Sequence, residues 1–195
     1  MNTLKILLTV FVTTLLLNGC APLVIGGAAA TGVNIAHDRR TVGTYIDDEG
    51  IELKAIAAIH REKELSSQIH INIISVNGVV LLVGQAPSEE LRQQAGSIIQ
   101  AIRKVRLVHN ELTIAAPSSL MTRSSDSVIT TKVKARLIGI KGHDDLDVTR
   151  VKVVTENGTV FLMGILYHAE ADAVTERASQ VGGVQKVVKL FEYLD

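Results

Sequence analysis

The chain has 195 residues, which is enough for one ordinary domain or two small ones. Lys and Arg together number 20, and so do Asp and Glu, so no global charge imbalance points to a nucleic-acid partner. Aromatic residues make up only 3% of the chain and Trp is absent, which leaves few side chains on which bases could stack.

The first residues are typical of a targeting segment. Lys5 supplies a positive charge and residues 6–17 are almost wholly apolar, but this run is shorter than the ~20 residues that a membrane-spanning helix needs. The segment ends at Leu17-Asn18-Gly19-Cys20, which resembles a bacterial lipobox rather than the Ala-x-Ala site of an ordinary secretory signal. We therefore expect residues 1–19 to be a signal peptide and Cys20 to be lipidated. A plain signal peptide or a short anchor is the alternative.

The residues after this segment support the same interpretation. Cys20 is the only Cys, so no intramolecular disulfide can form. Ala21 follows it, whereas an Asp at that place commonly retains enteric lipoproteins in the inner membrane. Residues 20–45, beginning with the lipidated Cys, are rich in Gly and Ala and show no sustained period, which indicates a tether. We expect a lipid-anchored protein of the outer membrane that faces the periplasm.

The rest of the chain is an internal repeat. Residues 79–84 follow Asn77-Gly78, and residues 159–164 follow Asn157-Gly158 in the same way. In the part of each copy that precedes these segments, matching positions lie two residues closer together in the sequence. The second copy therefore has a longer loop, at residues 142–147. We place the first copy at residues 46–115 and the second at residues 126–195. A polar linker, residues 116–125, joins them.

Each copy predicts the same order of elements. A first helix has apolar residues at i, i+4 and i+8, and an Asp near its start that complements the helix dipole. An alternating strand, an Asn-Gly type I′ turn and a continuously apolar strand follow, and the continuous apolar pattern indicates a central strand buried on both faces. A second helix and a last strand close the unit. The prediction is an α+β fold of two α-β-β-α-β domains, each with a three-stranded mixed sheet packed against two helices.

Four segments carry a resemblance to a known family. They are Arg40–Thr44 with Asp47-Asp48, Val80–Gln85, Ile129–Val133 and Thr155–Gly164. The repeat resembles the BON domain, and the order from lipobox to C-terminus resembles the outer-membrane lipoproteins that carry two such domains. This resemblance implies a non-enzymatic role in outer-membrane integrity, with a place at division sites or near the outer-membrane protein assembly machinery.

No motif predicts an enzyme or a cofactor. The chain has no nucleophile elbow, phosphate-binding loop or dinucleotide fingerprint. Among six His residues, none pairs with another at metal-ligand spacing on one element. The richest cluster, His143–Asp147, lacks the Glu and Gly spacing of a calcium loop and lies in the lengthened loop. A solvated turn is favoured there over a metal site.

The first helix of the second copy differs from that of the first copy in charge. Residues 127–143 contain no acid but four Lys or Arg residues, whereas residues 47–64 mix acids and bases. Helical periodicity puts an apolar stripe bordered by two lysines opposite the core. These candidate binding residues are Val128, Thr131, Lys132, Lys134, Ala135 and Ile138. Such a face is typical of a helix that lies on anionic headgroups, and an ordinary solvated face is the alternative.

The resemblance adds to this interpretation. It implies that the first helix of the second domain binds anionic phospholipid, and this carries over to residues 128–138. The resemblance also implies a Trp in relatives at the position of Val128, so the apolar contribution of that residue is expected to be weaker here. The rival hypothesis is a protein-interaction adaptor that docks envelope assembly or stress factors through the surface of the first domain.

Overall fold

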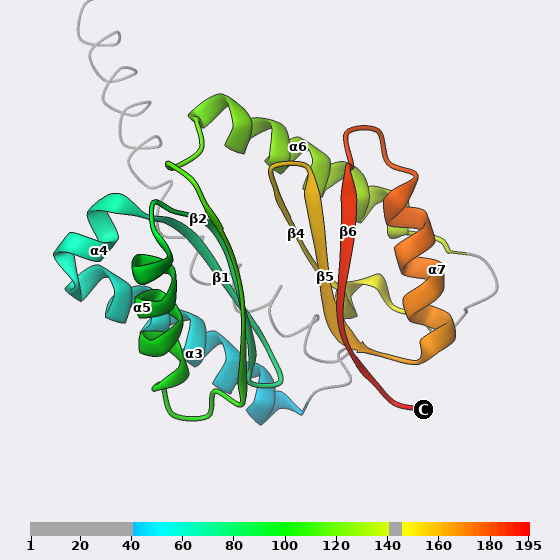
Figure 1. The fold of residues 1–195 in the computed structure, drawn as a ribbon. Coiled ribbons are helices and arrows are strands. Elements are labelled where there is room, and N and C mark those ends of the chain that lie inside the picture. Colours follow the sequence, from blue (N-terminus) through cyan, green and yellow to red (C-terminus); the bar gives the residue numbers. More distant parts are fainter. Residues whose placement is uncertain (1–40, 141–145) are drawn as a thin grey trace, which may run out of the picture. The chain divides into compact units, whose positions relative to one another are not determined.

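The computed structural model describes residues 41–140 and 146–195 (Figure 1). All of them belong to one compact unit, Asp38–Asp195. Within the described ranges, no helix combines the length and apolar character needed to cross a membrane.

Two copies of one fold follow each other along the chain. The first copy consists of α3 (Val42–Arg61), α4 (Lys63–Gln68), β1 (His70–Val76), β2 (Val79–Ala86), α5 (Glu89–Gln100) and β3 (Leu107–Ile114). The second consists of α6 (Leu120–Leu137), a short 3-10 turn (Val148–Arg150), β4 (Lys152–Glu156), β5 (Thr159–Leu166), α7 (His168–Ser179) and β6 (Lys186–Tyr193). The predicted α-β-β-α-β order and α+β class are confirmed, with α4 as an addition to the first copy.

Each sheet has three strands with the apolar strand in the centre. In the first sheet β2 pairs antiparallel with β1 and parallel with β3, and β5 does the same with β4 and β6. The hairpin turns are the predicted Asn-Gly pairs. Asn77 and Gly78 have φ of 53° and 73°, and Asn157 and Gly158 have φ of 48° and 71°. Positive φ at both central positions is what a type I′ turn requires.

The helices of each copy cover one face of its own sheet (Figure 1). Ile51, Ala55 and Ile59 of α3 are buried, as the i, i+4, i+8 spacing predicts. The equivalent residues of α6 are Ile129, Val133 and Leu137, with exposed fractions of 7%, 0% and 1%.

The other faces of the two sheets form a third core. It joins Val76, Leu81 and Val83 of the first copy to Phe161 and Met163 of the second. Each central strand is therefore covered by helices on one face and by the other copy on its second face, which explains its continuous apolar sequence.

Two helices begin earlier than the sequence predicted. Helix α3 begins at Val42, inside the expected tether, and α6 begins at Leu120, inside the expected linker. In both cases a hydroxyl side chain caps the helix: Thr41 Oγ1 accepts the N–H of Thr44 at 3.1 Å, and the Ser119 hydroxyl oxygen accepts that of Thr122 at 3.1 Å. The polar residues that looked like linker therefore start a helix.

Candidate functional site

Helix α6 presents all six candidate residues to solvent. Val128, Thr131, Lys132, Lys134 and Ala135 are exposed along the helix, and Ile138 is exposed at its C-cap. Two of them are large apolar side chains, Val128 with 50% and Ile138 with 70% of its surface accessible. We call these six residues the outward face of α6. The structure brings them together on the side opposite the buried Ile129, Val133 and Leu137.

All charged side chains on the outward face are positive. Lys132 and Lys134 lie on it and Arg136 lies beside it, and none of the three forms an ion pair with any residue that the structure describes. The single acid of the helix, Asp126, is buried. The helix therefore shows solvent three cations that form no ion pair within the described part of the chain, next to exposed apolar side chains.

Asp126 has a structural task that the sequence analysis missed. Its carboxylate accepts the N–H groups of Asn157 at 2.9 Å and Gly158 at 3.0 Å. In the first copy Asp48 accepts the N–H groups of Asn77 at 2.7 Å and Gly78 at 2.8 Å. The expected role of Asp48 at a helix start was wrong, because α3 begins six residues earlier. The signal was available: the same Asp precedes the same Asn-Gly pair in both copies.

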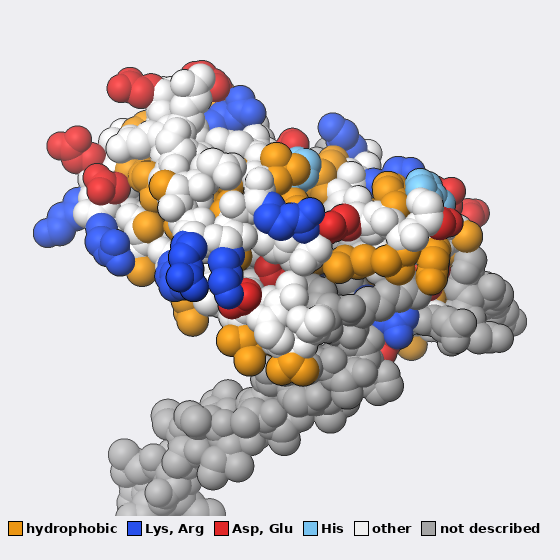
Figure 2. All heavy atoms as spheres, turned by 90° about the horizontal axis from the view of Figure 1, so that it is seen from below, with side chains coloured by type: hydrophobic (Ala, Val, Ile, Leu, Met, Phe, Trp, Pro, Cys, Tyr) orange, Lys and Arg blue, Asp and Glu red, His pale blue; other side chains and the backbone are white. Residues whose placement is uncertain are grey.

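Helix α3 carries a different surface. Asp47 forms an ion pair with Lys104 at 2.5 Å, and Glu49 approaches Lys152 at 3.9 Å, so its acids have basic neighbours. Figure 2, seen from the side on which α3 begins in Figure 1, shows basic and acidic side chains interspersed. A surface on which both signs of charge are mixed is not specifically attracted to an anionic bilayer.

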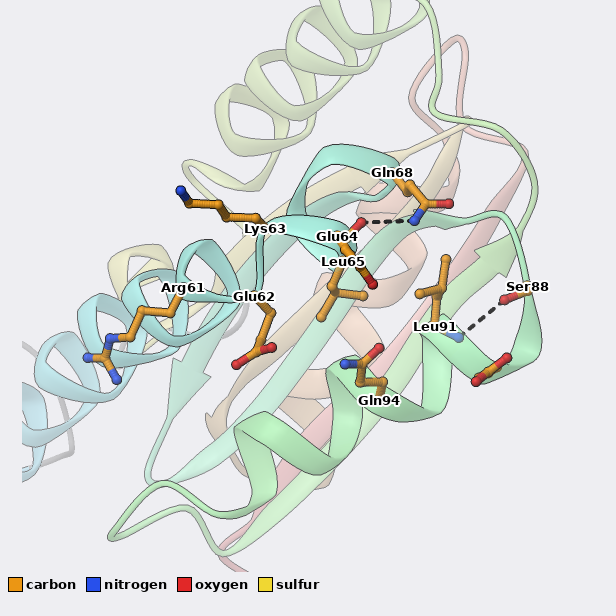
Figure 3. Close-up of a pocket in the computed structure, with 10 residues that line it drawn as sticks. Arg61, Glu62, Lys63, Glu64, Leu65, Gln68, Ser88, Leu91 and Gln94 are labelled. Atoms are coloured by element: carbon orange, nitrogen blue, oxygen red, sulfur yellow. Dashed lines mark hydrogen bonds between the residues drawn. The ribbon is translucent and has the colours of Figure 1, made fainter.

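A hollow of about 600 Å³ lies between the end of α3, α4 and the start of α5 (Figure 3). Its charged lining mixes Arg61 and Lys63 with acids, while the Leu91 N–H donates to the Ser88 hydroxyl at 3.2 Å and the Gln68 amide donates to the Glu64 carbonyl at 2.9 Å. These hydrogen bonds satisfy helix ends. The Ser88 hydroxyl of the lining therefore serves as the N-cap of α5.

Metal-ligating side chains do not gather in the described part of the chain. No group of three or more His, Cys, Asp or Glu residues is placed to hold an ion among residues 41–140 and 146–195. The cluster at His143–Asp147 falls mostly outside the described residues.

A polar cluster lies where the two copies meet. The buried Gln85 side chain donates to Glu156 Oε1 at 2.6 Å and accepts the N–H of Ser118 at 2.8 Å. His70 Nε2 lies 4.0 Å from Glu156 Oε2. Burial, with a smaller effect of nearby Arg123, lowers the pKa of His70 below its ordinary value, and the Glu156 carboxylate opposes this. No sequence pattern predicted this cluster, because its members come from separate elements.

The comparison with protein families finds one match for each of the two copies of the fold. The model of the BON domain matches residues 47–116 and again residues 125–195. The chain belongs to the BON-domain family. The resemblance on which the sequence analysis relied is thereby confirmed, and the two copies are BON domains.

Three relatives illustrate the kinship. The chain is 38% identical over 195 residues to "Outer membrane lipoprotein DolP" of Haemophilus influenzae, covering 100% of this chain and 99% of the relative. It is 37% identical over 157 residues to "21 kDa hemolysin" of Actinobacillus pleuropneumoniae, covering 80% and 79%. It is 28% identical over 162 residues to "Osmotically-inducible protein Y" of Escherichia coli, covering 81% and 78%.

The predicted lipidation site lies outside the described residues. Cys20, the expected signal peptide at residues 1–19 and most of the expected tether precede residue 41.

Proposed function

We propose that this protein is a non-enzymatic lipoprotein of the outer membrane, anchored through Cys20 and facing the periplasm. In this proposal the outward face of α6 binds anionic phospholipid and the protein supports the integrity of the membrane. The observation that carries the proposal is the combination on α6 of exposed apolar side chains and cations without described partners. The kinship with an outer-membrane lipoprotein over the full length supports the location.

The binding free energy that the cations supply is too small for the helix to hold an unanchored protein on the membrane, so the proposal requires the lipid anchor. Each cation near an anionic surface contributes at most ~1 kcal/mol, so Lys132, Lys134 and Arg136 together supply ~3 kcal/mol. That free energy alone corresponds to a dissociation constant weaker than ~1 mM. Acyl chains at Cys20 would hold the domain at an effective concentration on the order of millimolar near the bilayer. A weak site can then respond to local lipid composition.

The decisive experiment reverses two charges. The variant Lys132→Glu/Lys134→Glu, in a fragment of residues 21–195 that lacks the acyl chains and the expected signal peptide, should bind anionic vesicles at least ~30-fold more weakly. The matched control Lys54→Glu/Arg61→Glu makes the same charge change on α3 and should bind as before. Vesicle co-sedimentation at several lipid compositions measures both. A folded α6 variant that binds like the parent chain would overturn the proposal.

A separate experiment tests the lipid anchor at Cys20. Mass spectrometry of the mature protein should find a chain that begins at Cys20 and carries acyl groups there. An unmodified Cys20, or a chain that begins elsewhere, contradicts the anchor.

A second candidate function is a protein-interaction adaptor, with the outer-membrane protein assembly machinery as a partner. The favouring observation is the first BON domain, where Ile46 and Leu53 of α3 are 60% and 69% exposed. Exposed apolar side chains on one helix are typical of docking surfaces. Leu53→Glu should then abolish capture of that machinery from solubilised envelopes and leave vesicle binding unchanged, whereas a lipid-only function predicts no effect on either.

A further inference from the structure

The most exposed large apolar side chains of the described residues lie at the ends of α6. Leu120 and Met121 are 80% and 81% exposed, and Ile138 follows with 70%. The first two were outside the candidate residues, because the sequence placed them in a linker. They need a separate explanation, because two adjacent apolar side chains this exposed leave nearly all of their surface in water.

These side chains belong to the same stripe as the outward face. At about 100° per residue, the mean direction of Leu120 and Met121 lies within about 20° of that of Val128 and Ala135. The stripe therefore runs the whole helix, roughly 27 Å from Leu120 to Ile138 at 1.5 Å per residue. A helix with apolar contacts at both ends is suited to lie flat in an interface.

The start of α6 is held in place. The Ser119 hydroxyl caps it by accepting the N–H of Thr122 at 3.1 Å. The preceding Ser118 donates its N–H to the buried Gln85 side chain at 2.8 Å, and Arg123 Nε donates to the Ser118 hydroxyl at 3.3 Å. Leu120 and Met121 are thus fixed on a capped turn that is bonded to the first BON domain, and their exposure is built into the fold.

We infer that Leu120 and Met121 form the apolar anchor of α6, which enters the acyl layer of an anionic bilayer while Lys132 and Lys134 contact the phosphates further along the helix. The inference rests on the proposed function and names the residues that supply its apolar part. A bilayer is the occupant that the charges favour, because the helix shows three cations and no exposed acid.

Because the chain has no Trp, a single introduced Trp reports its own surroundings. The full lipidated protein is inserted into vesicles of phosphatidylcholine with or without phosphatidylglycerol. In the Leu120→Trp variant we expect a blue-shifted emission that brominated acyl chains quench, only in the vesicles that contain phosphatidylglycerol. The control Leu53→Trp changes a comparably exposed residue of α3 and should keep the emission of a ring in water.

A second variant removes the two side chains of the apolar anchor and measures the loss of binding. Leu120→Ser/Met121→Ser, combined with Val128→Trp as reporter, should dock on anionic vesicles on the order of 100-fold more weakly, or about tenfold for each side chain withdrawn from the acyl layer. Circular dichroism should find the same fold, because both positions are exposed. The docking that remains should weaken with added salt, because salt screens the contribution of the lysines.

The outcomes separate the two claims. If Val128→Trp alone responds to phosphatidylglycerol while Leu120→Trp does not, the anchor is overturned and the lipid-binding function stands. If neither reporter responds, the lipid-binding function fails and the anchor fails with it. Unchanged docking of the double Ser variant also overturns the anchor.

Discussion

Among single residues, Asp48 and Asp126 connect the first helix of each domain to its hairpin. Each buried carboxylate accepts both N–H groups of an Asn-Gly turn, and Asp48 also accepts the Ser75 hydroxyl at 2.6 Å. Hydrogen bonds to a charged acceptor are stronger than neutral ones, and the turn N–H groups have no water to replace them where they are buried. The helix and the turn are therefore fixed to each other.

We predict that Asp48→Ala lowers the free energy of unfolding by about 2–4 kcal/mol, because it leaves several donors without an acceptor. Asp48→Asn keeps the shape and one acceptor oxygen and should cost less. Urea unfolding followed by circular dichroism measures both. A loss below about 0.5 kcal/mol for Asp48→Ala, the range of an ordinary surface change, contradicts this role.

His70 predicts a dependence of stability on pH. Its pKa in the folded protein is lowered from 6.5, chiefly by burial and then by Arg123. The unfolded chain therefore takes up the proton first, so stability is full above about 6.5 and falls as the pH drops toward the folded pKa. The slope from one group is at most about 1.4 kcal/mol per pH unit.

His70→Gln should flatten this decline between about pH 7 and pH 5, measured by urea unfolding at several pH values. His60→Gln, at an exposed position of α3, is the matched control and should leave the decline as it is. An equal pH profile for both variants counts against His70.

At the scale of elements, the sequence predicted which face of each helix is buried and did not predict where the helices begin. Ile129, Val133 and Leu137 follow helical spacing, which depends only on local geometry, and they are buried. The starts of α3 and α6 depend on capping by Thr41 and Ser119, and the polar residues around such caps are also typical of linkers. Because the start of α6 was predicted too late, Leu120 and Met121 were not among the candidate residues.

We predict that Val128→Trp tightens binding to anionic vesicles, because an indole ring is favoured in the headgroup layer. The position is half-exposed on α6, so the ring fits without disturbing the core. Ile46→Trp on α3 serves as the comparison. Co-sedimentation should find tighter binding for Val128→Trp alone, and salt should weaken only the contribution of the lysines. Equal gains for both variants would mean that any exposed Trp suffices.

At the scale of the molecule, the two BON domains share the core of Val76, Leu81, Val83, Phe161 and Met163. Polar contacts join them as well, since the Asn77 amide donates to Glu192 at 2.9 Å and Arg106 donates to the same carboxylate at 3.1 Å. A domain of about 70 residues is only marginally stable alone. The continuous apolar run of each central strand predicted a covered second face, but periodicity cannot say which element covers it.

Phe161→Ala tests whether the domains stabilise each other. Phe161 is 5% exposed, and removing its ring should cost about 3–5 kcal/mol. If the shared core couples the domains, amide hydrogen exchange in β2 of the first domain should accelerate together with that in β5. Protection of β2 that stays unchanged would show that the domains unfold independently.

The repetition of the Asp–hairpin contact has an evolutionary consequence. Because both domains keep the same internal support, the outward side of each first helix is free to diverge at a cost within about 0.5 kcal/mol per change. Lys54 and Ala57 of α3 still match Lys132 and Ala135 of α6, while Ile56 stands where α6 has Lys134. A duplicated ancestor could thus have assigned different partners to its two halves by a few surface substitutions, without redesigning either fold.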